Sequence, residues 1–235
     1  MPLPSLLVSV RNAREANALR GSTCAIVDVK EPSRGALGMA DRTEIHDISK
    51  AICEHQTMSV ALGEVSDQGD CPALPQRVSF AKLGMSGLIG TDWKERWLSS
   101  RDRLANQSIS WVAVIYADHK AARSPDPEAV VEAAAQTGCA VVLADTFAKS
   151  PGTSVFDSMS VLELASLRDQ TNAAGMQFAL AGQLRVHHAS QIAEVAPDIV
   201  GIRGAACRAG DRQSELDAAL VDEFAAAIAT NPVST

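Results

Sequence analysis

The stretch AIVDVKEP, Ala25–Pro32, decides how the rest of the chain is interpreted. It begins as a continuous apolar run, and its last residues before Pro32 are charged. Continuous rather than alternating apolar runs are typical of strands that are buried on both faces of a parallel sheet. Asp28 and Lys30 are two positions apart, so in a strand both side chains point to the same side. Because a buried lysine is costly unless it is paired or used chemically, this strand end is a candidate site.

Seven further apolar runs resemble this one, and helical signals lie between them. With the run already described, the eight are Leu6–Val10, Ala25–Val29, Ser59–Leu62, Phe80–Leu83, Trp111–Tyr116, Ala140–Ala144, Gln177–Ala181 and Ile199–Ile202. Strand and helix thus alternate at about 29 residues per unit, close to the unit of a (β/α)8 TIM barrel. We expect one such barrel domain over residues 1–235. A doubly wound open sheet is less favoured, because Ser9–Asn12 lacks the glycine-rich turn of that fold.

Capping patterns mark several helix starts. Asn12 with Glu15, Asp126 before a proline, and Ser160 with Glu163 have the residue types that cap helix N-termini. The last helix is expected to place one apolar stripe on the barrel, formed by Leu216, Leu220, Phe224 and Ile228. The segment after the third apolar run is a weak helix candidate, because Pro72 and Pro75 lie within it.

Composition narrows the class of protein. The net charge of −7 argues against nucleic acid as a partner, which would require a basic face. No apolar run reaches the roughly 18 residues that span a bilayer, and the N-terminus lacks a basic leader, so we expect no membrane partner. The five cysteines are scattered and never in CxxC spacing; Cys24 and Cys139 are expected to be buried free thiols. A cytoplasmic location follows as an expectation.

Charged residues recur at the ends of the second, fourth and sixth runs. Lys82 follows Phe80 and Ala81, whereas Asp145 and Lys149 follow the sixth run. In a TIM barrel the carboxyl ends of the strands form the active site, so these residues would join Asp28 and Lys30. A lysine near other cations has a lowered pKa and attacks carbonyl groups. A structural ion pair between aspartate and lysine is the alternative interpretation.

Glycines mark the loops after the seventh and eighth runs. Gly182 and Gly204 would let the backbone approach a ligand closely, and Arg203 would add positive charge. Barrels often bind phosphate at this place, so these three residues are candidate phosphate ligands. The alternative is that each glycine only turns a tight loop.

The other conspicuous residues carry weaker signals. No metal-binding motif is present, and His187 and His188 would point to different sides of a helix, so a shared metal ion is not expected. Trp93, Trp97 and Leu98 resemble a helix stripe that belongs to the core or to an interface between copies of the chain, which leaves a homo-oligomer open. Glu64 after the third run is interpreted as part of a solvated loop.

Four motifs together resemble the (5-formylfuran-3-yl)methyl phosphate synthase family of methanofuran biosynthesis. The most specific is VDVKEP, 27–32, followed by GALG, 35–38; the others are AKLG at 81–84, ADT at 144–146 with Lys149, and VGIRGA at 200–205. They occur in the same order as in that family, over nearly the whole chain. The segment Glu64–Val78, rich in aspartate and proline, departs most from the family pattern.

The resemblance implies a (β/α)8 lyase that condenses two glyceraldehyde 3-phosphate molecules with loss of one phosphate and water. It implies that Lys30 forms a Schiff base, that Lys82 accepts a proton, and that Asp28, Asp145 and Lys149 support proton transfer. The ligand is then a small phosphorylated triose, and no cofactor is required. Another class I aldolase or phosphosugar enzyme, and a non-catalytic barrel that binds a phosphorylated metabolite, remain alternatives.

Overall fold

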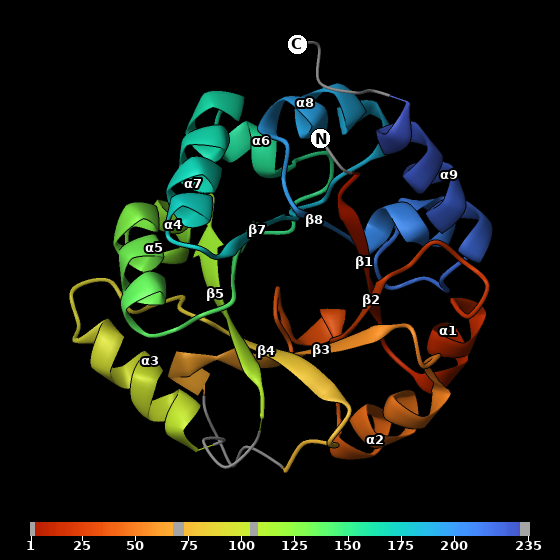
Figure 1. Ribbon diagram of the computed structural model, residues 1–235, viewed down its shortest axis with the longest axis horizontal. Helices are drawn as coiled ribbons and strands as arrows, with labels where there is room; N and C mark the ends of the chain where they lie inside the picture. The colour runs from red at the N-terminus through yellow and green to blue at the C-terminus, as the bar shows by residue number, and fades with distance from the viewer. Residues whose placement is uncertain (1–2, 68–72, 104–107, 231–235) are drawn as a thin grey trace.

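The apolar runs of the sequence form the eight strands of a closed parallel barrel (Figure 1). The computed structural model describes residues 3–67, 73–103 and 108–230. Each strand pairs with the next in sequence, and β8 pairs with β1, which closes the ring and excludes the open sheet. The strands are β1 (Ser5–Val10), β2 (Ile26–Val29), β3 (Thr57–Glu64), β4 (Val78–Gly84), β5 (Ser110–Tyr116), β6 (Val141–Asp145), β7 (Gln177–Leu180) and β8 (Ile199–Ile202).

Helices surround the barrel in Figure 1, as the predicted (β/α)8 fold requires. They are α1 (Ala13–Ala18), α2 (Arg42–Ala51), α3 (Trp93–Asp102), α4 (His119–Ala122), α5 (Pro127–Gln136), α6 (Val155–Ser158), α7 (Val161–Ala173), α8 (Ala189–Val195) and α9 (Ala218–Ala229). The predicted caps are confirmed: Asn12 accepts a hydrogen bond from the backbone N–H of Glu15, and Ser160 forms a capping box with Glu163. The Asp126 side chain caps α5 by accepting hydrogen bonds from the backbone N–H groups of Glu128 and Ala129.

The predicted stripe of the last helix is partly wrong. Helix α9 begins at Ala218 and buries Val221, Phe224 and Ile228. Leu216 is buried before the helix begins, in a bridge to Cys207, and Leu220 is only half-buried. Residues four apart drift around a helix of 3.6 residues per turn, so a strict spacing of four does not stay on one face.

The segment between β3 and β4 differs from the other connections. Its described part contains a short 3₁₀ helix, Val65–Asp67, and no α-helix, which agrees with the weak helical signal there. Pro72 lies outside the described residues. Strand β3 extends further than the sequence indicated, to Glu64, so the interpretation of Glu64 as solvated loop is wrong.

The core has two layers. Most apolar side chains fill the space between the strands and the helices, and Trp97 is fully buried there, which confirms the core alternative for this residue. Cys24 and Cys139 are buried free thiols, as predicted. A second cluster that includes Ile26, Val112 and Leu143 fills the barrel interior. No helix among the described residues is long and apolar enough to cross a membrane.

Candidate active site

The polar mouth of the barrel begins with a row of residues on neighbouring strands. The strand register places Ser9 of β1 beside Asp28 of β2, and Asp28 beside Ser59 of β3. Ser9 Oγ donates to Asp28 Oδ2 at 3.1 Å. Lys82, from β4, donates to Ser59 Oγ at 3.0 Å and forms a direct ion pair with Asp28. The structural ion pair that the sequence left open therefore exists, but the partner of Asp28 is Lys82 rather than Lys30.

The Asp28–Lys82 pair is almost completely shielded from solvent. Asp28 is 1% exposed and Lys82 is 2% exposed. Burial by itself raises the pKa of Asp28, but the charges of Lys82 and Lys30 outweigh it, so the pKa is lowered. Asp28 is therefore an ionised carboxylate, and its negative charge stabilises the nearby positive charge of Lys82.

A second pair lies at the end of β6. Lys149 Nζ donates to Asp145 Oδ1 at 2.6 Å and to Thr146 Oγ1 at 3.0 Å, and the backbone N–H of Thr146 donates to the same carboxylate oxygen at 2.8 Å. Burial raises the pKa of Asp145, and the charges of Lys149 and Lys30 lower it by more. The sequence correctly placed Asp145 and Lys149 in the same mouth.

Lys30 differs from the other two lysines. It lines a cavity of about 550 Å³ together with Asp28, Lys82, Asp145 and Lys149. Among the described residues, no carboxylate lies within 4 Å of its amine and no acceptor receives a hydrogen bond from it.

Burial lowers the pKa of Lys30 to about 8. The negative charges of Asp145 and Asp28 oppose this shift, whereas the positive charges of Lys149 and Arg212 add to it. Lys149 and Arg212 are thus cationic neighbours of Lys30, and Arg212 is a residue that the sequence pattern did not single out.

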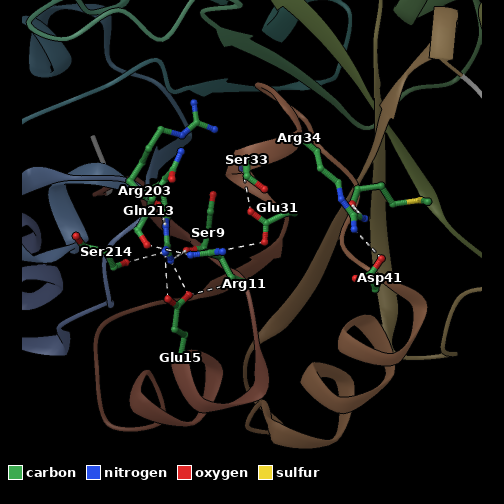
Figure 2. Close-up of polar contacts among 12 residues, drawn as sticks. Ser9, Arg11, Glu15, Glu31, Ser33, Arg34, Asp41, Arg203, Gln213 and Ser214 are labelled. Carbon is green, nitrogen blue, oxygen red and sulfur yellow. Dashed lines mark hydrogen bonds and ion pairs between the residues drawn. The ribbon is translucent and has the colours of Figure 1, made fainter.

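Arg203, a predicted phosphate ligand, is buried among protein acceptors. Its guanidinium donates to Glu15 on α1 through two nitrogens, at 2.6 and 3.0 Å, and its other N–H groups donate to the backbone oxygens of Ser9, Arg212 and Ser214 (Figure 2). All five donors of an arginine are thereby occupied. A phosphate contact from Arg203 would require it to give up one of these bonds.

Both predicted glycines, Gly182 and Gly204, lie at the cavity wall, as expected. Gly182 has φ +100°, and a Cβ atom there would lie 2.8 Å from Val155 Cβ, so the position requires glycine. A Cβ atom at Gly204 would lie 3.2 Å from Arg185 Nη2, so this glycine makes room for a side chain as well as for backbone.

Arg185 and Arg212 are cavity residues that sequence reasoning missed. Arg185 follows β7 and Arg212 follows β8, and both loops were already candidates for phosphate binding. The cluster of two arginines within Arg208–Arg212 was a usable signal, because an arginine after strand eight of a barrel is well placed for an anionic ligand.

Glu64 was also missed. Its carboxyl group accepts hydrogen bonds from Tyr116 Oη at 2.5 Å and from the backbone N–H of Ser86 at 2.9 Å. A Cβ atom at Gly84 would collide with this carboxyl group, so Gly84 admits Glu64 into the mouth. Tyr116 is fully buried and pairs in register with Asp145. No signal in the sequence connects Glu64 with a tyrosine 52 positions away.

The charge of the cavity is opposite to that of the whole chain. Among the described residues that line it, six side chains are lysine or arginine and three are aspartate, whereas the chain carries −7 overall. Two lysines and Arg203 have carboxylate partners. Within the described ranges, no three histidine, cysteine, aspartate or glutamate side chains are placed to share a metal ion. The cavity thus fits an anionic small molecule with a group that reacts with an amine.

Comparison with known proteins agrees with this geometry. The family model described as 4-HFC-P synthase matches residues 6–225. The (5-formylfuran-3-yl)methyl phosphate synthase of Methanopyrus kandleri is 34% identical to this chain and covers 96% of it and 99% of its own length. The synthase of the same name from Methanococcus maripaludis is 33% identical, with coverages of 88% and 91%. Phosphoribosyl anthranilate isomerase from Thermus thermophilus has a TM-score of 0.62 and 12% identity, with coverages of 96% and 98%; this likeness shows the fold alone.

Proposed function

The chain belongs to the 4-HFC-P synthase family, and from that premise we propose that it makes (5-formylfuran-3-yl)methyl phosphate from two molecules of glyceraldehyde 3-phosphate. The product would serve methanofuran biosynthesis. Two trioses supply its six carbons, and the atoms balance when one phosphate and two molecules of water leave. The observation that carries the proposal is the Lys30 amine in the cavity wall, which has no ion-pair partner in the described part of the chain and whose pKa of about 8 keeps part of it neutral.

Lys30 acts as the nucleophile in this proposal. With a pKa of about 8, about one amine in ten is neutral at pH 7. The neutral amine attacks the aldehyde carbon of one triose, and loss of water from the adduct gives an iminium. The iminium withdraws electrons, so the proton on the adjacent carbon becomes removable. The resulting enamine either expels the phosphate two carbons from the iminium or attacks the aldehyde of the second triose.

The two ion pairs supply the proton transfers. The Lys82 ammonium, held by the ionised Asp28, can give a proton to the substrate and, as the neutral amine, accept one back. Asp145 and Lys149, whose charged atoms are 2.6 Å apart, offer a second acceptor and donor near Lys30. Ring closure and loss of water need repeated proton transfers, which accounts for two such pairs in one cavity.

The test of the product is direct. Purified protein is incubated with glyceraldehyde 3-phosphate alone, and the mixture is examined by mass spectrometry for the furan aldehyde phosphate and for inorganic phosphate. A different condensation product would contradict the proposal and would identify the protein as another class I aldolase.

The test of the mechanism uses borohydride. Reduction during turnover should leave a stable triose adduct that peptide mapping places on Lys30, and Lys30→Ala should carry none. If the wild type forms no adduct, the Schiff-base mechanism is refuted. If the wild type also forms no product, the result favours a barrel that only binds a phosphorylated metabolite.

A further inference from the structure

Arg185 and Arg212 are the guanidinium groups of the cavity that, among the described residues, have no carboxylate within 4 Å. We propose that these two arginines together bind the phosphate of the triose, a phosphomonoester dianion. The inference rests on the proposed function, because it assigns the anionic end of the substrate whose aldehyde reacts with Lys30.

Arg185 is held in place by the β8 loop. Its Nη2 donates to the backbone oxygen of Gly210 at 2.8 Å. Gly204 and Gly210 both leave space beside its guanidinium, since a Cβ atom on Gly210 would lie 2.9 Å from Arg185 Nη1. Gly210 also has φ +69°, which favours glycine independently. Two glycines therefore make a slot for this arginine, and its bond to Gly210 is the one side-chain hydrogen bond that it forms with the described residues.

Arg212 connects the loops that follow the two strands on either side of β1. It starts in the loop after β8, and its Nη2 donates to the backbone oxygen of Gly35 at 3.0 Å, in the loop after β2. Its charge acts on both Lys30 and Asp145. The cation thus lies at the end of the cavity where the Schiff base would form, with only one N–H given to a described protein acceptor.

Arg203 fixes the backbone of Arg212. Its Nε donates to the backbone oxygen of Arg212 at 2.8 Å, and the Glu15 carboxylate holds the Arg203 guanidinium from below. Arg203 is therefore a positioning residue that acts through Arg212. This explains why a buried arginine follows β8 at the place where a phosphate ligand was expected.

The chemistry of the ligand follows from these groups. Planar guanidinium groups match the oxygens of a phosphate by bidentate hydrogen bonds, which are stronger than neutral ones. A triose phosphate carries its aldehyde and its phosphate at opposite ends of a three-carbon chain. A cavity with an amine and two free guanidinium groups on its wall can engage both ends at once and so orient the aldehyde toward Lys30.

The first experiment uses glycerol 3-phosphate, which has no carbonyl group and cannot form an imine. Its affinity is measured by titration calorimetry for the wild type, Arg185→Gln, Arg212→Gln and the control Arg208→Gln. Arg208 lies in the same loop but is exposed and does not line the cavity. We expect about tenfold to hundredfold weaker binding for the first two variants and no change for the control. Arg212→Lys, which keeps the charge without the planar group, should bind with intermediate affinity.

Inorganic phosphate is titrated in parallel. Binding of both probes through the same arginines identifies the phosphate group as the element recognised. Equal affinities of wild type, Arg185→Gln and Arg212→Gln for glycerol 3-phosphate would overturn the inference, and far-ultraviolet circular dichroism verifies that each variant is folded.

The second experiment separates this inference from the proposed function. Borohydride trapping compares glyceraldehyde 3-phosphate with unphosphorylated glyceraldehyde. We expect Arg185→Gln, which removes no charge that acts on the Lys30 pKa, to keep the Lys30 adduct with glyceraldehyde and to lose the preference for the phosphorylated substrate. An unchanged preference, with the adduct present, would overturn the phosphate site and leave the Schiff base intact. An absent Lys30 adduct in the wild type would instead overturn the proposed function.

Discussion

Arg203 and Lys30 both carry a positive charge at the end of a barrel strand, yet their surroundings are opposite. Arg203 is 6% exposed and gives all five of its N–H groups to protein acceptors, two of them to the Glu15 carboxylate. Lys30 is half-buried beside a cavity and, among the described residues, has no acceptor. The first charge holds the fold together, whereas the second is kept without a partner at a cost in stability. A charge left unsatisfied at a cavity is the stronger sign of chemistry.

Replacing Lys30 tests the unsatisfied charge. We expect Lys30→Met to lose at least about 10³-fold in product formation, the scale seen when a covalent nucleophile is removed. The free energy of unfolding of the same variant at pH 7 should be higher than that of the wild type by about 1–3 kcal/mol. Product assay and denaturant unfolding on one preparation check both expectations.

The sign of the stability change follows from the pKa. The folded pKa of Lys30 is about 8, below its ordinary 10.5, so a charged Lys30 destabilises the fold fully below pH 8. This penalty fades as the pH rises from about 8 to about 10.5. The advantage of Lys30→Met should fade over the same window, and a variant less stable than the wild type at pH 7 would contradict the comparison.

Replacing Arg203 tests the satisfied charge. Arg203→Met leaves Glu15 buried without its partner, so we expect a loss of about 3–5 kcal/mol in the free energy of unfolding. Denaturant titration measures the loss. The exposed Arg208, whose nearest carboxylate is 3.8 Å away, offers a matched control, and Arg208→Gln should change stability by less than about 0.5 kcal/mol. Similar losses of unfolding free energy in both variants would show that the buried Arg203–Glu15 pair does not stabilise the fold more than an exposed arginine does.

The pH dependence of Lys30 reactivity sharpens the comparison further. Trapping of a small aldehyde should increase with pH around a midpoint near 8, because only the neutral amine reacts. Asp145→Asn removes a charge that raises the pKa, so the midpoint should fall by about one unit; Arg212→Gln removes a charge that lowers it, so the midpoint should rise. Midpoints that do not move in opposite directions would refute the electrostatic assignment.

The smallest expected effect concerns Glu64. Tyr116→Phe removes the hydroxyl group that donates to the Glu64 carboxyl, and we expect a loss of about 1–2 kcal/mol in unfolding free energy. Asp67 lies three residues beyond and is exposed, so Asp67→Asn provides a control without an expected loss. An unchanged stability of Tyr116→Phe would return Glu64 to the solvated role that the sequence suggested.

The sequence was most informative where local rules act. The apolar runs predicted every strand to within a few residues, and capping patterns marked the starts of α1, α5 and α7. It was less informative for contacts between distant segments. The end of β3 was predicted too early because Glu64 is polar, and its partner Tyr116 is 52 positions away.

By itself the sequence determined the barrel and the lysines and aspartates of its mouth, because strand periodicity and the βα repeat are properties of neighbouring residues. Only the tertiary structure decided which charges are paired. Asp28 pairs with Lys82 across β3, and Arg203 pairs with Glu15, 188 positions away. These pairings leave Lys30, Arg185 and Arg212 without carboxylate partners among the described residues. Closing the barrel sets which charges meet, because ion pairing depends on distances of a few ångströms that local sequence does not encode.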